Sequence, residues 1–190
     1  MSTAHPPALA PGIVPPQRID LGDLVVRRWE TTDLGAQLAA INASFEHLHP
    51  WMAWLPTPRT ADEQREFNEV ASSGWPPPDG NFGYGIFDSE GVLLGAIGLH
   101  DRVGPATLEI GYWCHIAHTG HGVITRAAAA LTEVALGLAG IERVQICCDA
   151  ANERSAAVPR RLGYRLARIE AREVDAPAQS GRGLVFVQSG

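Results

Sequence analysis

The sequence predicts a protein of the α+β or mixed α/β class, in which helices and a sheet form packed layers. Three apolar, β-branched or aromatic runs at residues 82–87, 92–100 and 107–115 follow one another, separated by short turn sequences, as consecutive antiparallel strands do. A helix then alternates with further strands along the rest of the chain. This order of meander, helix, strand, helix and strand is typical of that class.

Length and composition support one folded unit and exclude several kinds of protein. The chain has 190 residues, of which 45% are apolar and 19% charged, so it is too hydrophobic for a disordered chain. No run of eighteen apolar residues exists to span a membrane. The net charge of −6 argues against nucleic acid as the main partner. Three cysteines and the lack of secretory-signal features at the start predict a reduced, cytoplasmic setting.

The first elements follow a proline-rich start. Residues 1–17 contain five prolines and predict a flexible tail, with a single domain over residues 18–190. Alternation at residues 24–29 predicts the first strand, and Thr32-Asp33 can cap a helix that runs to about Ile41.

An aromatic, histidine-rich stretch, FEHLHPWMAW, occupies residues 45–54 and precedes a polar helix predicted over residues 61–72. Prolines at positions 50, 56 and 58 break regular structure between them. We expect this region to form a lid or side wall. His47 and Trp51 are the candidates for an acceptor pocket, although a packing role for the tryptophans is equally compatible with the sequence.

The second half completes the layers. An Ala- and Leu-rich segment predicts a buried helix, and it is followed by a strand, a short helix and two more strands; these elements span residues 124–138, 144–148, 152–162, 164–170 and 184–187.

Two short motifs lie where strands give way to helices. Gly120-His121-Gly122 precedes the long helix, where consecutive backbone N–H groups can converge on an anion such as phosphate; a tight turn is the alternative. Asn152 and Ser155 stand one helical turn apart directly after a strand, where Asn152 can equally be a helix cap.

Together these segments resemble a known family. EIGYW at residues 109–113, HTGHGVITRAA at 118–128 and CDAANERSAAVPRRLGYRL at 148–166 resemble the acyl-coenzyme A motifs of the GNAT N-acetyltransferase superfamily. SFEHLHPWMAW at 44–54 resembles its RimJ/RimL-like branch. The resemblance implies a central, mostly antiparallel sheet flanked by helices, which splays apart after its fourth strand so that pantetheine runs into the opening.

The resemblance also implies the residues that bind acetyl-coenzyme A. Backbone N–H groups would hold the pyrophosphate, Asn152 and Ser155 would lie beside the thioester, and an N–H near His115 or Ile116 would face the oxyanion; the pyrophosphate set is Gly120, His121, Gly122, Val123 and Thr125. Thr119 replaces the usual Arg or Gln and Ile124 the usual Gly or Ala, so we expect weaker coenzyme binding.

Acyl transfer to an amine requires a base and a donor to the leaving thiolate. Glu109 is the candidate base, because a carboxylate among strand residues needs a partner or a task; a salt-bridge role is equally compatible. His100, at the end of the preceding strand, is a second candidate near the acceptor, and Ser155 is the candidate donor.

The function predicted is transfer of an acetyl group from acetyl-coenzyme A to a primary amine, foremost a protein or peptide N-terminal α-amine. A small-molecule N-acetyltransferase acting on antibiotics or polyamines, a larger acyl group such as succinyl, a non-catalytic acyl-coenzyme A sensor and a homodimer stay open. No metal is predicted, because the potential zinc ligands lack the paired spacing of zinc sites; they are Cys114, His115, His118 and His121.

Overall fold

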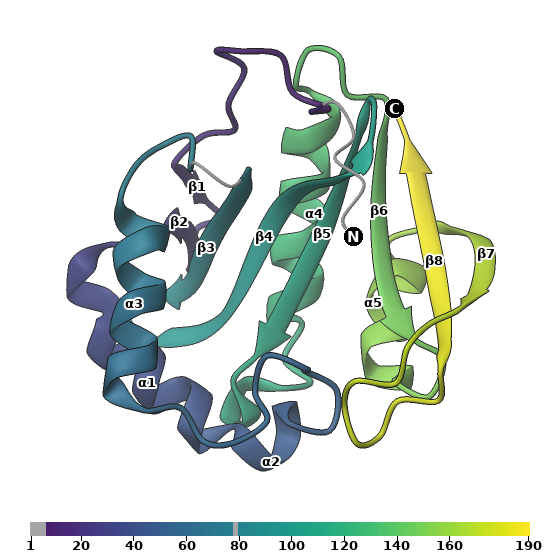
Figure 1. The fold of residues 1–190 in the computed structure, drawn as a ribbon. Helices are drawn as coiled ribbons and strands as arrows, with labels where there is room; N and C mark the ends of the chain where they lie inside the picture. The colour runs from purple at the N-terminus through teal and green to yellow at the C-terminus, as the bar shows by residue number, and fades with distance from the viewer. Residues whose placement is uncertain (1–6, 78–79) are drawn as a thin grey trace.

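The computed structural model describes residues 7–77 and 80–190 and contains one eight-stranded sheet (Figure 1). The strands are β1 (Arg18–Asp20), β2 (Leu24–Arg28), β3 (Asn81–Asp88), β4 (Leu93–Gly104), β5 (Thr107–Cys114), β6 (Arg143–Asp149), β7 (Arg165–Ala171) and β8 (Arg182–Ser189). Their order across the sheet is β1-β2-β3-β4-β5-β6-β8-β7. Every neighbouring pair is antiparallel except β5 and β6. This confirms the predicted fold class.

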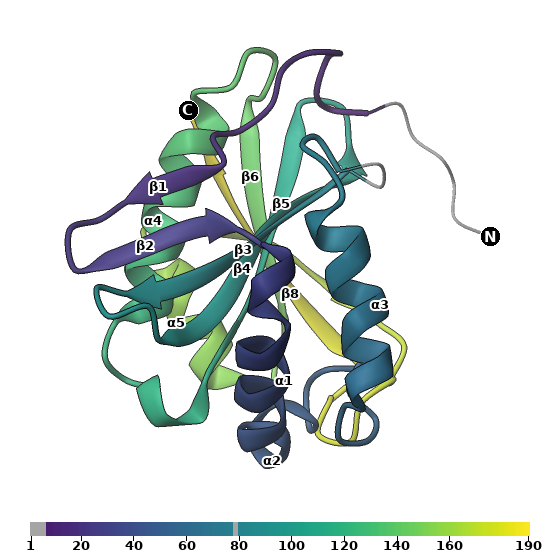
Figure 2. The ribbon, with the colours of Figure 1, turned by 90° about the vertical axis from the view of Figure 1, so that its left-hand side faces the viewer.

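Helices cover both faces of the sheet (Figures 1 and 2). The α-helices are α1 (Leu34–Ala43), α2 (Phe45–Leu48), α3 (Ala61–Ser72), α4 (Val123–Leu136) and α5 (Glu153–Arg161), and two short 3-10 turns are η1 (Thr31–Asp33) and η2 (Ile116–His118). α4 packs on β4, β5 and β6, and α5 packs on β6, while α1 lies against β4 on the opposite face with α3 beside it. Among residues 7–77 and 80–190, no helix has the length and apolar character needed to cross a bilayer.

The main core lies between α4 and the middle of the sheet. Ala127, Ala128 and Leu131 on the inner face of α4 are fully buried, as are Leu108 and Val144 on β5 and β6. Small alanine side chains let the helix approach the sheet closely, and burying the apolar area on both sides stabilises the contact. The parallel pairing of β5 with β6 requires the crossover that α4 supplies.

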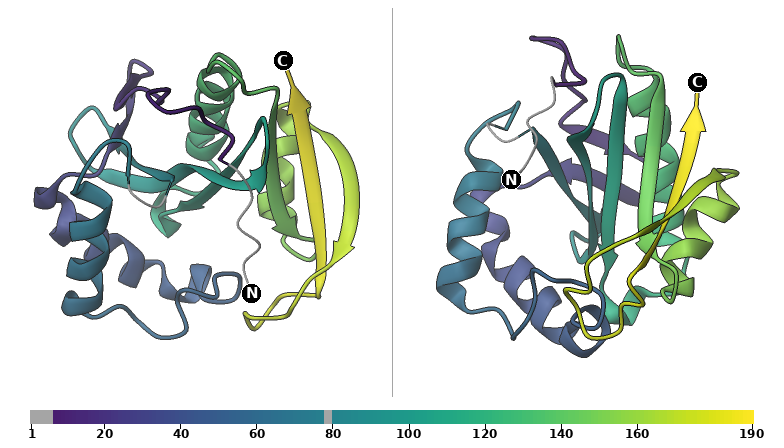
Figure 3. Two further views of the ribbon diagram at one scale, coloured as in Figure 1. Left: turned by 45° about the horizontal axis from the view of Figure 1, so that its top comes forward. Right: turned by 45° about the vertical axis from the view of Figure 1, so that its right-hand side comes forward.

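The sheet separates where the site lies. β5 and β6 pair only from Thr107 with Arg143 to Ile110 with Ile146, and beyond that point β5 pairs with β4 alone and β6 with β8 alone. The two strands diverge toward the ends that carry Cys114 and Asp149 (Figure 3). The sequence predicted a split after the fourth strand. Because the short β1 was not predicted, that fourth strand is β5 of the structure, and the sheet separates there.

Residues 7–17 differ from the predicted flexible tail. Leu9 is buried, and the Ala8 N–H donates to the Asp101 carboxylate at 2.9 Å. The carbonyl oxygens of Pro15 and Pro16 accept from Trp75 Nε1 at 2.8 Å and Tyr84 Oη at 3.0 Å. Prolines donate no backbone hydrogen bond but accept readily, so the half-buried indole of Trp75 and the buried phenol of Tyr84 hold this segment on the core. The first six residues of the predicted tail lie outside the described residues.

Candidate active site

Two cavities lie side by side where β5 and β6 separate. The helix-side cavity, of about 650 Å³, extends from β5 and β6 to α1 and α3. The turn-side cavity, of about 1260 Å³, lies between the Gly120–Gly122 turn and α5. The two linings have six residues in common, namely Trp51, Met52, Tyr112, Trp113, Asn152 and Ser155. A ligand in either cavity therefore reaches the same shared wall.

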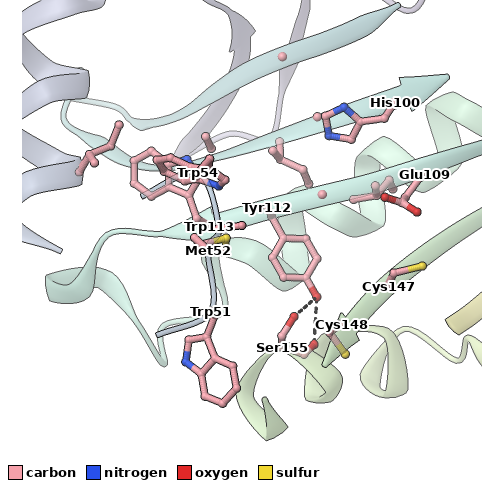
Figure 4. A pocket seen from close by; sticks show the side chains of 18 of the residues that line it. Trp51, Met52, Trp54, His100, Glu109, Tyr112, Trp113, Cys147, Cys148 and Ser155 are labelled. Carbon is pink, nitrogen blue, oxygen red and sulfur yellow. Dashed lines mark hydrogen bonds between the residues drawn. The ribbon is translucent and has the colours of Figure 1, made fainter. Parts of the chain in front are cut away.

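Tyr112 and Ser155 form the polar part of that wall (Figure 4). The Tyr112 hydroxyl donates to the Ser155 carbonyl oxygen at 3.0 Å and accepts from the Ser155 hydroxyl at 3.3 Å. Burial raises the pKa of the Tyr112 phenol, so it stays protonated at neutral pH. Asn152 accepts from the Ser155 N–H at 3.1 Å and so caps α5, which the sequence allowed.

The turn before α4 presents backbone donors to the turn-side cavity. Gly120 and Gly122 have φ of 81° and 75°, in the left-handed region that glycine adopts without strain. Gly122 is the N-cap of α4 and has no side chain to accept from the first helical turn. Val123 and Thr125 line the cavity beside it. The helix N-terminus therefore faces this cavity with N–H groups and a partial positive charge.

Three arginines add positive charge to the turn-side cavity. Arg126, Arg154 and Arg161 line it together with two carboxylates, Glu46 and Glu153. Arg126 is also ion-paired with Asp23 at the surface. The cavity thus combines N–H donors and guanidinium groups, which fits a ligand that carries phosphate groups. Thr119 lines the cavity but carries no charge. The three arginines supply positive charge from other positions, and the sequence analysis did not single them out as ligands.

Glu109 lies in the lining of the helix-side cavity and is 8% exposed. Its Oε1 accepts from Arg102 Nε at 3.0 Å and from Nη2, and its Oε2 accepts from Gln145 Nε2 at 2.7 Å. Burial alone would raise the pKa of Glu109, but the Arg102 charge and these hydrogen bonds outweigh it and lower the pKa. The carboxylate is therefore ionised at neutral pH. Glu109 forms a salt bridge with Arg102, which is the alternative role that the sequence allowed.

His100 lies beside Glu109 in the same lining, because the two residues face each other in the register of β4 and β5. Its Nδ1 is 2.7 Å from Asn81 Oδ1. Gly98 and Gly111 make room for its ring, since a Cβ built at either position would lie 3.0–3.2 Å from His100 Nε2.

The oxyanion expectation at His115 and Ile116 is not met. The His115 N–H donates to the Leu94 carbonyl at 2.9 Å, and the Ile116 N–H donates to Ser44 Oγ at 3.0 Å. Ser44 is buried at the end of α1, 72 residues earlier in the chain. Both donors are thus already engaged by the protein, and neither residue lines either cavity.

One histidine lies on a different side of the shared wall from the one that the acceptor prediction implies. His47 lines the turn-side cavity and not the helix-side one. In that position burial, and then the nearby Arg154 charge, lower its pKa. The side chain of His121 is exposed and outside both linings, and the prediction for this residue concerned only its backbone N–H. Trp51 lines both cavities, as part of the shared wall.

The three cysteines are free thiols. Cys147 and Cys148 line the helix-side cavity, and burial raises the pKa of Cys147 to about 12 and that of Cys148 to about 11. Both therefore stay protonated at neutral pH and are poor nucleophiles. Over residues 7–77 and 80–190, no three His, Cys, Asp or Glu side chains are grouped to hold a metal ion.

Comparison with known families gives a match over most of the chain. Residues 23–165 match the family model described as an acetyltransferase (GNAT) domain. A Bacillus subtilis (strain 168) protein named "Putative ribosomal N-acetyltransferase YdaF" is 31% identical over an alignment of 150 residues, and the match covers 74% of this chain and 77% of that protein.

Solved structures share the fold. RimL, a ribosomal L7/L12 α-N-protein acetyltransferase in complex with coenzyme A, superposes with a TM-score of 0.80 at 18% identity and covers 90% of this chain and 97% of its own. The microcin C7 self-immunity acetyltransferase MccE, in complex with acetyl-CoA and AMP, gives 0.81 at 18% identity and covers 96% and 99%.

Proposed function

The chain belongs to the acetyltransferase (GNAT) domain family and is an N-acetyltransferase that uses acetyl-coenzyme A, and from this premise we propose that its acceptor is the α-amine at the N-terminus of a protein or peptide. The observation that carries the proposal is the pair of cavities that share the wall around Tyr112 and Ser155. A donor and an acceptor entering from opposite sides meet only there, so attack of the amine on the thioester needs no covalent enzyme intermediate.

The coenzyme would lie in the turn-side cavity. Its pyrophosphate would accept from the N–H groups at Gly120 to Val123, with Arg126, Arg154 or Arg161 nearby. The acetyl thioester would then reach the shared wall, where the Ser155 hydroxyl can turn from Tyr112 and donate a hydrogen bond to the leaving sulfur as the C–S bond breaks.

The acceptor amine would enter through the helix-side cavity. Glu109 is ionised there and can take the amine proton through water once the new C–N bond has formed. Because Arg102 and Gln145 occupy both of its oxygens, it is a weak base. A weak base favours an acceptor that is already partly neutral.

An N-terminal α-amine meets that condition and a lysine does not. With pKa values near 7.8 and 10.4, about a third of α-amines but only about 0.1% of lysine amines are neutral at pH 7.5. The name of the B. subtilis relative, which describes a ribosomal N-acetyltransferase, supports a protein acceptor.

Two peptides of identical sequence test the proposal. One has a free α-amine and an acetylated lysine, and the other has an acetylated N-terminus and a free lysine. We expect the enzyme to transfer acetyl groups from acetyl-coenzyme A to the first peptide at least a hundredfold faster, as measured by mass spectrometry. Faster transfer to the second peptide, or transfer to polyamines and aminoglycosides alone, would contradict an N-terminal acceptor.

A further inference from the structure

Helix α3 is packed with its polar side inward. Its buried residues are Gln64 and Asn68, whereas Phe67 and Val70 are 44% and 52% exposed. The neighbouring α1 contributes a third buried amide, Gln37, which is 1% exposed. Helices that only cover a sheet normally bury apolar residues, because burying amides is unfavourable unless all their hydrogen bonds are made. α1 and α3, which carry these amides, lie side by side (Figure 2).

The hydrogen bonds of the cluster fix how each amide points. Asn68 Nδ2 donates to the Glu30 backbone carbonyl and to Gln37 Oε1, both at 3.1 Å. Gln64 Nε2 donates to the same Gln37 Oε1 at 2.9 Å. A backbone carbonyl only accepts, so Asn68 must present its NH₂ here and Gln37 must present its oxygen to both neighbours.

This orientation leaves one donor and one acceptor over. Within the part of the chain that is described, Gln37 Nε2 and Gln64 Oε1 are buried and have no hydrogen-bond partner. Both residues line the helix-side cavity. A buried polar group without a partner destabilises the fold, and this cost is recovered when a ligand supplies the partner. Arg59 Nε is a second buried donor without a partner, and Arg59 also lines this cavity.

We propose that Gln37 and Gln64 form a recognition site for an amide group of the acceptor, set back from the reacting amine. An amide supplies a carbonyl oxygen for Gln37 Nε2 and an N–H for Gln64 Oε1. A carboxylate offers acceptors only and an ammonium group donors only, so each leaves one of the two glutamine groups unpaired. The inference rests on the proposed function, because it takes the acceptor amine to react at the shared wall at the other end of the cavity.

Peptide acceptors with one changed group test the site in the intact enzyme. In one arm, each backbone amide of a tetrapeptide in turn is replaced by an ester, which removes the N–H and weakens the carbonyl as an acceptor. In the other arm, Gln, Glu or Leu is placed at positions 2, 3 and 4. If the site binds a backbone amide, we expect kcat/KM to fall at least tenfold for one of the esters. If it binds a side-chain amide, we expect kcat/KM to be at least tenfold lower with Glu or Leu than with Gln at one position.

Two variants assign the effect to the glutamines. Gln64→Met removes the free acceptor, so the tenfold difference in kcat/KM between the preferred peptide and the changed one should shrink to less than threefold. Gln37→Glu keeps the oxygen that binds Gln64 and Asn68 but replaces the free donor, and it should also abolish the preference. Gln17→Glu makes the same chemical change at an exposed position outside the cavity and should leave the preference intact.

Three results would overturn the inference. These are equal rates across both arms in the wild type, a preference that persists unchanged in a folded Gln64→Met variant, and a preference for Glu over Gln, which would assign recognition to Arg59. The first and third results are measured with the wild-type enzyme, so the inference can be tested even if a variant does not fold. Failure of the proposed function looks different, because then no peptide α-amine in either arm is acetylated.

Discussion

Arg102→Met should turn Glu109 from a stabilising carboxylate into a destabilising one. In the wild type the lowered pKa of Glu109 means that the ionised form is favoured by folding. That stability is present above the unfolded-state pKa of about 4.3 and is lost as the pH falls. Without Arg102, burial raises the pKa of the carboxyl above its unfolded-state value, so the variant loses stability as the pH rises through the new pKa.

The size of the effect follows from the contacts. Arg102 makes two charge-assisted hydrogen bonds to Glu109 Oε1, and such contacts contribute about 1.5–3 kcal/mol. The Arg102 side chain is 59% exposed, so solvent screening places the contribution at the low end, about 1.5–2 kcal/mol. Gln145 keeps its hydrogen bond to Oε2 and prevents a larger change.

Urea unfolding at pH 3.5, below the unfolded-state pKa, and at pH 7.5 measures this change. The free energy of unfolding of Arg102→Met should fall by about 2 kcal/mol relative to the wild type at pH 7.5 and by under about 1 kcal/mol at pH 3.5, where Glu109 is largely protonated. In a Glu109→Gln background the same substitution should cost less than about 0.5 kcal/mol at both pH values. An equal loss at both pH values, or an equal loss in both backgrounds, would refute the electrostatic explanation and leave only lost packing.

Four further substitutions test the site. Gly122→Asp puts a carboxylate and a strained φ at the turn, so acetyl-coenzyme A binding by calorimetry should fall below detection; unchanged affinity would exclude this turn as the phosphate site. Ser155→Ala should lower kcat at least tenfold with unchanged coenzyme affinity, whereas a lower Tm alone would indicate a purely structural role. Glu109→Gln should lower kcat/KM about a hundredfold at pH 7 and less at pH 9, and a loss independent of pH would favour positioning over proton transfer. Trp51→Ala should raise KM severalfold for both substrates, since Trp51 lines both cavities; an effect on one KM alone would assign it to one side.

The sequence predicted most helices and strands well, because their ends and extents depend on residues that are close together in the chain. The helix over residues 61–72 has the predicted bounds, since the capping box of Thr60 and Glu63 fixes its start. The strands from residue 82 onward follow from runs of β-branched and aromatic residues. β1 has only three residues and no such run, so nothing in its composition indicated a strand.

The site was predicted only where one motif contains all its parts. Ser155, Gly120 and Gly122 fall within contiguous motifs, and all three line the turn-side cavity. The Ile116 N–H is taken by Ser44, which α1 brings from 72 residues away, and no local pattern encodes that contact. The buried face of α3 was equally hidden, because amides at helical spacing are typical of a solvated face.

The position of β8 imposes an order on folding. β7 precedes β8 in the chain but pairs only with β8, which itself occupies the outer edge of β6. During synthesis, β7 therefore leaves the ribosome with no edge to join until the later strand has inserted. Cys147 and Cys148 lie on β6, so this wall of the helix-side cavity stays an unprotected edge for the same interval. Substitutions that weaken β8 should thus increase aggregation of newly made chains more than they lower the activity of the folded enzyme.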